Sequence, residues 1–117
     1  MARTLNPLVL IVLLLSIISG DIVKSVQAEK TWCVAKPSSD DATLLANINY
    51  ACSQVDCRFM QKGCPCFYPD TLINHASAVM NLYYQSRGRN PWNCFFKNSA
   101  IVTVTDPSYG SCVYAYA

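Results

Sequence analysis

A chain of 117 residues with a formal net charge of +2 has room for one domain and carries no strong excess of either charge. We therefore expect neither a nucleic-acid partner nor attraction to a charged membrane surface. The chain also contains seven cysteines, a number that favours a small domain held together by disulfides in an oxidising compartment.

The first 28 residues have the pattern of a secretory signal peptide. Arg3 provides a basic start, Leu8–Ile18 is apolar at every position except Ser16, and Val26 and Ala28 are small residues before the expected cleavage. A membrane anchor is the alternative, but a spanning helix needs about 20 apolar residues, and this run has eleven. We expect cleavage after Ala28.

The mature domain is then residues 29–117, since removing 28 residues from 117 leaves 89. It holds seven basic and six acidic side chains, a net charge of +1, and all seven cysteines. A domain of this size buries a modest core and usually gains stability from disulfides. No apolar tail follows Cys112, so we expect a secreted protein without a lipid anchor.

The first half of the domain predicts one strand and one helix. Thr31–Ala35 is short, apolar and β-prone. Asp41–Cys52 is predicted to be an amphipathic helix, with Ser39 or Asp40 as its N-cap. Its apolar residues recur at helical spacing: Leu44, Leu45, Ile48 and Cys52. Ser53–Pro69 has no clean period and is predicted to be an irregular loop fixed by disulfides.

The second half predicts another helix and a hairpin. Asp70 is the predicted N-cap of the helix, and Gly88 is its predicted end. One face of this helix is apolar: Leu72, Ala76, Val79, Met80 and Tyr83. Ala100–Thr105 alternates like a half-buried strand, and Ser111–Tyr114 is predicted to return as a short strand. The expected fold is therefore α+β, with two helices against a small antiparallel sheet.

These segments together resemble the plant X8 domain, which is the family-43 carbohydrate-binding module. The resemblance rests on Trp32–Ala35, Tyr50–Cys52, Asp56–Cys57, Pro65–Phe67, Asn81–Gln85 and Thr105–Cys112. It covers Thr31 to Tyr114, nearly the whole mature chain. Similar domains occur alone, as in plasmodesmata callose-binding proteins, or as the C-terminal module of plant β-1,3-glucanases. The resemblance implies binding of β-1,3-glucans such as callose and laminarin in the cell wall.

The cysteine pattern leaves the disulfide pairing open, because six bridged cysteines chosen from seven allow 105 arrangements. The resemblance implies the pairs Cys33–Cys94, Cys52–Cys57 and Cys66–Cys112. Cys64 stands where the family usually has glycine, and we expect it to be a buried free thiol. One alternative is a reactive or intermolecular thiol. A zinc ligand is a weaker alternative, because Cys-Pro-Cys is not the usual spacing of zinc ligands. Met80 stands where phenylalanine is common, a replacement that a core tolerates.

The residues that could perform catalysis have simpler interpretations. A glycosidase needs two carboxylates about 5–9 Å apart. Four aspartates are assigned to helix starts and a turn, namely Asp40, Asp41, Asp70 and Asp106. Asp56 alone has no structural role, and one carboxylate is not enough. His75, the only histidine, has no evident partner to orient its ring. We expect no enzymatic activity, no cofactor and no metal.

The aromatic residues are the best candidates for ligand contact, because sugar rings present apolar C–H faces to aromatic side chains. Neighbouring tyrosines on a helix point about 100° apart, so Tyr83 is predicted to be in the core and Tyr84 in solvent. The predicted glucan platform contains Tyr84, Gln85, Arg87, Tyr68 and Trp92. Trp32 and Phe67 are expected in the core, and Phe95 or Phe96 is the next candidate with Trp92.

The sequence thus predicts a monomeric, non-catalytic domain that binds β-1,3-glucan in the plant cell wall. A secreted cysteine-rich defence or structural protein without glucan affinity is the alternative. The low net charge argues against a peptide that attacks membranes, since such peptides are usually basic. A hydrolase is disfavoured because the second carboxylate is missing.

Overall fold

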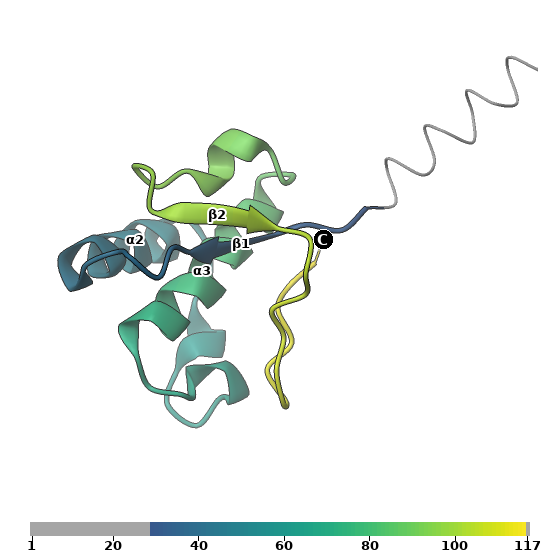
Figure 1. Cartoon of the computed structure of the whole chain (residues 1–117). Helices are drawn as coiled ribbons and strands as arrows, with labels where there is room; N and C mark the ends of the chain where they lie inside the picture. Colours follow the sequence, from purple (N-terminus) through teal and green to yellow (C-terminus); the bar gives the residue numbers. More distant parts are fainter. Residues whose placement is uncertain (1–28, 117) are drawn as a thin grey trace, which may run out of the picture.

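The helix α3, Leu72–Ser86, occupies the centre of the structure, a computed structural model that describes residues 29–116. It packs against the helix α2 on one side and the strand β1 on another (Figure 1). The second long helix, α2, is Asp41–Gln54. The remaining elements are short, namely β1 Trp32–Ala35, η1 Arg58–Met60, η2 Pro65–Phe67, η3 Pro91–Cys94 and β2 Ala100–Thr103. The predicted signal peptide at 1–28 lies outside the described residues.

Both predicted α-helices are present, and local interactions fix where they begin and end. The Asp40 carboxylate caps α2 by accepting the Thr43 backbone N–H at 2.8 Å. The predicted cap of α3 was wrong by one residue, because Thr71 Oγ1 accepts the Asn74 N–H. The Asp70 carboxylate instead lies 3.6 Å from His75 Nε2. Gly88, with φ of +84°, follows the end of α3 as predicted.

The sheet has two antiparallel strands, with Trp32 opposite Thr103 and Ala35 opposite Ala100. The fold class is therefore confirmed, although the predicted strand at Ser111–Tyr114 is wrong. That segment forms only one bridge, between Tyr109 and Cys112. Side chains hold it instead, since Ser108 Oγ accepts the Tyr114 N–H and Asn81 Nδ2 donates to Ala115 O. β2 also ends earlier than predicted, because Thr103 Oγ1 accepts the Thr105 N–H.

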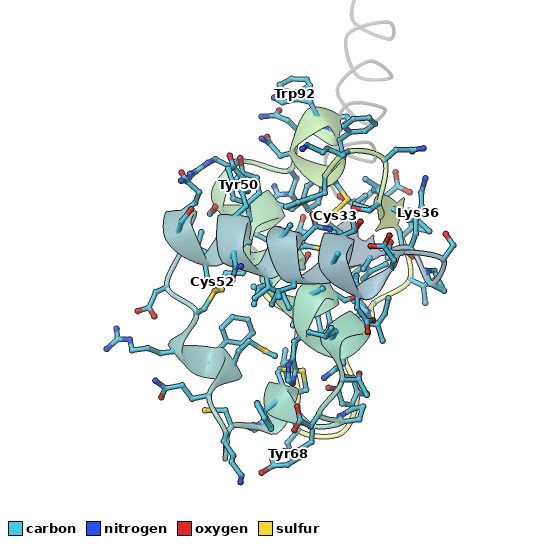
Figure 2. All side chains as sticks on the ribbon, turned by 90° about the vertical axis from the view of Figure 1, so that its left-hand side faces the viewer. Cys33, Lys36, Tyr50, Cys52, Tyr68 and Trp92 are labelled. Carbon is cyan, nitrogen blue, oxygen red and sulfur yellow. A yellow bond between two sulfur atoms is a disulfide. The ribbon has the colours of Figure 1, made fainter. Side chains whose placement is uncertain are left out.

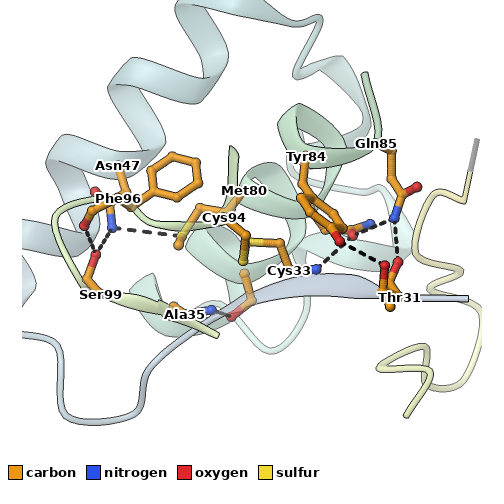
Figure 3. Close-up of a disulfide and its surroundings, with 12 residues drawn as sticks. Thr31, Cys33, Ala35, Asn47, Met80, Tyr84, Gln85, Cys94, Phe96 and Ser99 are labelled. Carbon is orange, nitrogen blue, oxygen red and sulfur yellow. Dashed lines mark hydrogen bonds between the residues drawn. A yellow bond between two sulfur atoms is a disulfide. The ribbon is translucent and has the colours of Figure 1, made fainter. Parts of the chain in front are cut away.

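Polar side chains of α3 seal the edge of β1 that is not paired with β2. Ser77 Oγ accepts the Ala35 N–H at 3.0 Å, and Asn81 Oδ1 accepts the Cys33 N–H at 3.1 Å. One turn further along, Gln85 Nε2 donates to Thr31 O at 2.9 Å (Figure 3). These side chains are spaced four residues apart, so they lie along one stripe of the helix. The stripe replaces a third strand and leaves these edge groups paired.

Three disulfides link these elements, and they are the pairs that the family resemblance implied. Cys33–Cys94 joins β1 to η3, Cys52–Cys57 closes the end of α2, and Cys66–Cys112 joins η2 to the C-terminal segment. The first and last close loops of 61 and 46 residues. In the chain-entropy model, a disulfide that closes a loop of that length stabilises the fold by about 4 kcal/mol. Cys64 is unpaired and half-buried.

The core lies around α3 rather than on one side of it. Met80 and Ala76 pack with Cys33 and Leu44 between the helices and the sheet. Ala78 packs with Trp32, Cys66, Cys112 and Tyr114 toward the C-terminal segment. Val79 and Tyr83 pack with Ala51 toward α2. The middle of α3 is therefore buried on all sides. None of the helices within residues 29–116 is long and apolar enough to cross a bilayer.

The two ends of the described chain meet beside β1. The Tyr116 ring lies 6.0 Å from the Trp32 ring, with Lys30 Nζ 5.0 Å from its centre. The Arg89 guanidinium lies 4.8 Å from the same ring. Figure 1 shows the C-terminus next to the start of β1.

Candidate functional site

Tyr84, the centre of the predicted platform, is buried rather than exposed. Its side chain is 2% exposed, and its hydroxyl forms a 2.8 Å hydrogen bond with Thr31 Oγ1. The predicted exposure of Tyr84 was wrong because β1 covers the side of α3 that the sequence pattern had left to solvent. Tyr83 is 9% exposed, so both neighbouring tyrosines lie in the core.

Gln85 is also buried, at 3% exposure, and its amide is committed to the fold. Its Nε2 donates to Thr31 O and to Asn81 Oδ1. Arg87 is exposed, but its guanidinium lies 4.9 Å from the Tyr83 ring and donates to Gln54 Oε1 at 3.0 Å. The predicted platform at the end of α3 is therefore corrected: Tyr84 and Gln85 offer no surface to a ligand.

Tyr68 and Trp92 are exposed as predicted, but they lie at opposite ends of the molecule (Figure 2). The Tyr68 ring is 49% exposed and packs edge-on against Phe67. The Tyr68 carbonyl accepts a hydrogen bond from the Tyr109 hydroxyl. Trp92 is 72% exposed, the most exposed aromatic side chain among residues 29–116. These two residues cannot form one binding surface, so the end with more exposed aromatic area is the stronger candidate.

A groove of about 630 Å³ lies beside Trp92, between α2 and η3, and we call it the aromatic groove. The aromatic rings that line it are those of Tyr50, Tyr83, Trp92 and Phe96. Tyr50 lies 5.4 Å from Tyr83 and 6.4 Å from Phe96, and Tyr83 lies 5.7 Å from Phe96, all in edge-to-face arrangements. Tyr50 is half exposed, so this cluster combines a packed base with accessible rings.

Polar groups accompany these rings along the aromatic groove. Thr43, Asn47, Asn93 and Lys97 share its lining. The hydroxyls of Tyr50 and Tyr83 lie 3.3 Å apart. That hydrogen bond lowers the pKa of Tyr83, with Arg87 adding to the effect, and it raises the pKa of Tyr50. Apolar rings with a few donors and acceptors are typical of sites for small organic ligands and sugars.

Local backbone structure positions the η3 side of the aromatic groove. Pro91 begins η3, where its fixed φ suits the first helical position, and Cys94 anchors η3 to β1. Phe96, Lys97 and Asn98 then have φ values of +48°, +53° and +65°. The Ser99 N–H closes this turn by donating to Phe95 O and Phe96 O. Asn47 Nδ2 on α2 donates to Ser99 Oγ at 2.8 Å and joins the two sides of the groove (Figure 3).

A second, smaller hollow of about 460 Å³ lies on the other side of α3. Phe59, Leu82, Val113 and Tyr114 are among its lining residues. Asp56, which the sequence left without a role, lies at this hollow beside Arg58, whose Nε donates to both of its carboxylate oxygens. The hydrogen bonds from Arg58 lower the pKa of Asp56.

The other groups considered for catalysis also have structural partners. The Asp106 carboxylate accepts the Ser108 N–H at 2.9 Å, and hydrogen bonds from the Ser108 side chain and backbone lower the pKa of Asp106. His75 Nε2 lies 2.7 Å from Phe67 O, and its ring stacks on Phe67. Cys64 Sγ lies 3.7 Å from Arg58 O. Within residues 29–116, no three His, Cys, Asp or Glu side chains gather as metal ligands would.

Sequence reasoning named Trp92 and Phe96 but missed Tyr50 and Lys97. The aromatic groove combines residues from α2, α3 and the η3 segment, so no single periodic pattern reveals it. One signal was available for Tyr50, because it lies off the apolar stripe that contains Leu44 and Ile48. An aromatic ring off the buried stripe is expected at the surface.

Comparison with known proteins places these observations in a family. The X8 domain model matches residues 31–101. The major pollen allergen Ole e 10 of Olea europaea is 47% identical over 90 residues, which make up 75% of this chain and 73% of the allergen.

Two longer relatives carry enzyme names. A glucan endo-1,3-beta-D-glucosidase of Olea europaea is 55% identical over 87 residues, covering 74% of this chain and 19% of the glucosidase. A glucan endo-1,3-beta-glucosidase of Triticum aestivum is 53% identical over 83 residues, covering 71% of this chain and 18% of its own. The chain thus spans about a fifth of the length of these glucosidases. Because the family model matches more than half of its residues, the chain belongs to the X8 domain family.

Proposed function

We propose that this domain binds β-1,3-glucan without cleaving it, and that the aromatic groove is the binding surface. The observation that carries the proposal is that the exposed Trp92 ring and the half-exposed Tyr50 ring line the same groove of about 630 Å³. We also propose that the protein is secreted to the plant cell wall and acts there as a monomer.

The chemistry of the aromatic groove suits a sugar polymer. Trp92 and Tyr50 offer flat apolar faces to the C–H faces of glucose rings. The aromatic faces are exposed to water and would be buried when a sugar binds. The exposed Lys97 offers a hydrogen-bond donor for ring hydroxyls at the same groove. Arg87 does not line the groove, but its guanidinium lies 4.9 Å from the centre of the Tyr83 ring.

The relatives support glucan as the ligand and argue against hydrolysis by this chain alone. The names of the glucosidases refer to glucan with 1,3-beta linkages, but this chain matches only about a fifth of their length. The carboxylates of Asp40, Asp56 and Asp106 are each bound to groups of the domain itself. We therefore assign the matched segment a binding role.

The test is the affinity of the purified mature domain for laminarin, measured by calorimetry. We expect Trp92→Ala to weaken binding by roughly tenfold, about 1.4 kcal/mol, with little change in melting temperature because the ring is 72% exposed. Tyr68→Ala is the matched control, since it removes an exposed ring from the opposite end (Figure 2). It should bind laminarin like the parent.

Other outcomes would identify another function. Equal loss in both variants would place glucan on an extended surface and reject the aromatic groove as the site. No binding by the parent domain would favour the secreted defence or structural protein without glucan affinity. Release of reducing sugar over hours, abolished in a substituted carboxylate, would show a hydrolase.

A further inference from the structure

The turn Phe96–Asn98 contains three successive non-glycine residues in the left-handed backbone region. This region brings Cβ close to the following carbonyl oxygen and is disfavoured for L-residues other than asparagine and aspartate. Single residues adopt it regularly, but runs of three are uncommon. The fold must therefore offset the cost of this turn, or the turn must serve a ligand.

Contacts within the domain offset the conformational cost at two of the three residues. The Phe96 ring packs against Tyr50 and Tyr83. Asn98 belongs to a residue type that tolerates this conformation, and its Oδ1 accepts a 2.7 Å hydrogen bond from Lys36 Nζ. The backbone of both residues continues into Ser99, which Asn47 holds.

Lys97 differs, because the described structure shows no interaction that offsets the cost of its left-handed backbone conformation. Its side chain is exposed, and in the described chain it forms no hydrogen bond, ion pair or ring contact. Glycine would adopt a φ of +53° at lower cost. Yet Lys97 lines the aromatic groove, where its side chain is the only charged one among the lining residues of the described part.

We propose that Lys97 is a specificity-determining residue of the aromatic groove, and that the left-handed turn serves to present its ammonium group to the bound glycan. An ammonium group has three donors and no acceptor, so it would donate hydrogen bonds to hydroxyl oxygens of a sugar whose ring stacks on Trp92 or Tyr50. This inference rests on the proposed function and adds to it a donor that faces the ligand.

The test compares stability and laminarin affinity in the same variants of the mature domain. Lys97→Gly should melt at the same temperature as the parent or a few degrees higher, because glycine relieves the backbone cost. It should nevertheless bind laminarin at least about tenfold more weakly, the size expected for one lost hydrogen bond to a charged group. Lys97→Arg should retain most of the affinity, because arginine keeps the charge and the donors.

Lys62→Ala is the matched control, since it removes the same charge from an exposed loop position outside the aromatic groove. It should leave the affinity unchanged. Equal weakening in Lys62→Ala and Lys97→Gly would reveal a general charge effect and overturn the proposal. A lower melting temperature in Lys97→Gly would also overturn it, because Lys97 would then stabilise the turn itself.

The failure of this inference is distinguishable from failure of the proposed function. If the parent binds laminarin, Trp92→Ala weakens that binding and Lys97→Gly does not, the aromatic groove stands and the role of Lys97 is rejected. If the parent does not bind laminarin, both are rejected.

Discussion

The two sides of α3 use similar residue types for different purposes. Toward β1, the helix presents Ser77, Asn81, Tyr84 and Gln85, and these side chains are at most 8% exposed. Toward α2 and η3, Tyr83 forms the base of the aromatic groove, where Tyr50 is 50% exposed and Trp92 is 72% exposed. The first side is closed by backbone partners, and the second remains open.

This difference shows that residue type alone does not mark a binding site. On the closed side, the Ser77 hydroxyl and the amides of Asn81 and Gln85 satisfy the backbone of β1 and of Thr31 just before it, an edge that would otherwise lack partners. On the open side, Tyr83 forms the packed base of the aromatic groove, and the rings of Tyr50 and Trp92 remain accessible. Substitutions on the closed side should therefore change stability, whereas those on the open side should change binding.

The largest expected effect on the closed side is that of Tyr84→Ala. Emptying a buried aromatic site costs about 3–5 kcal/mol, and the variant also loses the hydrogen bond to Thr31. We expect a large fall in the free energy of unfolding, measured with urea. Tyr84→Phe removes only the hydroxyl and should lose about 1 kcal/mol while binding laminarin normally. Loss of binding in a folded Tyr84→Phe domain would contradict the division between the two sides.

Asn81→Ala tests the sealing of the sheet edge. Asn81 is completely buried, accepts the Cys33 N–H and donates to Ala115 O. Removing its amide leaves the buried Cys33 N–H and the part-buried Ala115 carbonyl without this partner, which should cost about 2–3 kcal/mol. Gln61→Ala, at an exposed loop position, should cost less than about 0.5 kcal/mol. Similar unfolding midpoints for the two variants would show that the edge of β1 needs no partner from α3.

The smallest expected effect is a loss of stability at alkaline pH caused by Tyr114. Burial, with a smaller contribution from the charge of Tyr109, raises the pKa of Tyr114 to about 12. Because the folded state holds this proton more tightly, its contribution is complete below about pH 10, the ordinary pKa of tyrosine. That contribution should be lost as the pH rises from 10 toward 12.

The measurement is the melting temperature at pH 9 and at pH 11 in a Cys64→Ser background, which prevents thiol exchange with the disulfides. The parent should lose more stability between these pH values than Tyr114→Phe, which has no phenol to ionise. Equal losses in the two proteins would show that Tyr114 stays neutral or ionises without cost.

The elements of the fold could be predicted because they rest on local signals. The capping residue Asp40, the end of α3 at Gly88 and the alternation that begins at Ala100 all act within a few residues. The strand expected at Ser111–Tyr114 was wrong because its partners are side chains from distant segments, such as Asn81. Local β-propensity does not report such partners.

The position of Tyr84 was wrong because an amphipathic pattern assumes that a helix has a solvent face. α3 contains no Asp, Glu, Lys or Arg from Leu72 to Ser86. The absence of charged side chains over four turns is typical of a central helix that is enclosed on all sides. The sequence therefore did indicate that Tyr84 could be buried. The aromatic groove had no comparable signal, since Tyr50 and Trp92 come together only when α2 and η3 pack around Tyr83.

The meeting of the chain ends at Tyr116 has a consequence for how the domain can be joined to other proteins. Lys30 and Tyr116 lie close together, with Nζ of the lysine 5.0 Å from the centre of the tyrosine ring. A polypeptide entering at one and leaving at the other would do so on the same side of the molecule, beside the start of β1 (Figure 1), which is the geometry that tolerates fusion or insertion as a self-contained unit. Grafting the domain into a surface loop of an unrelated carrier would therefore place both attached segments beside the same end of β1.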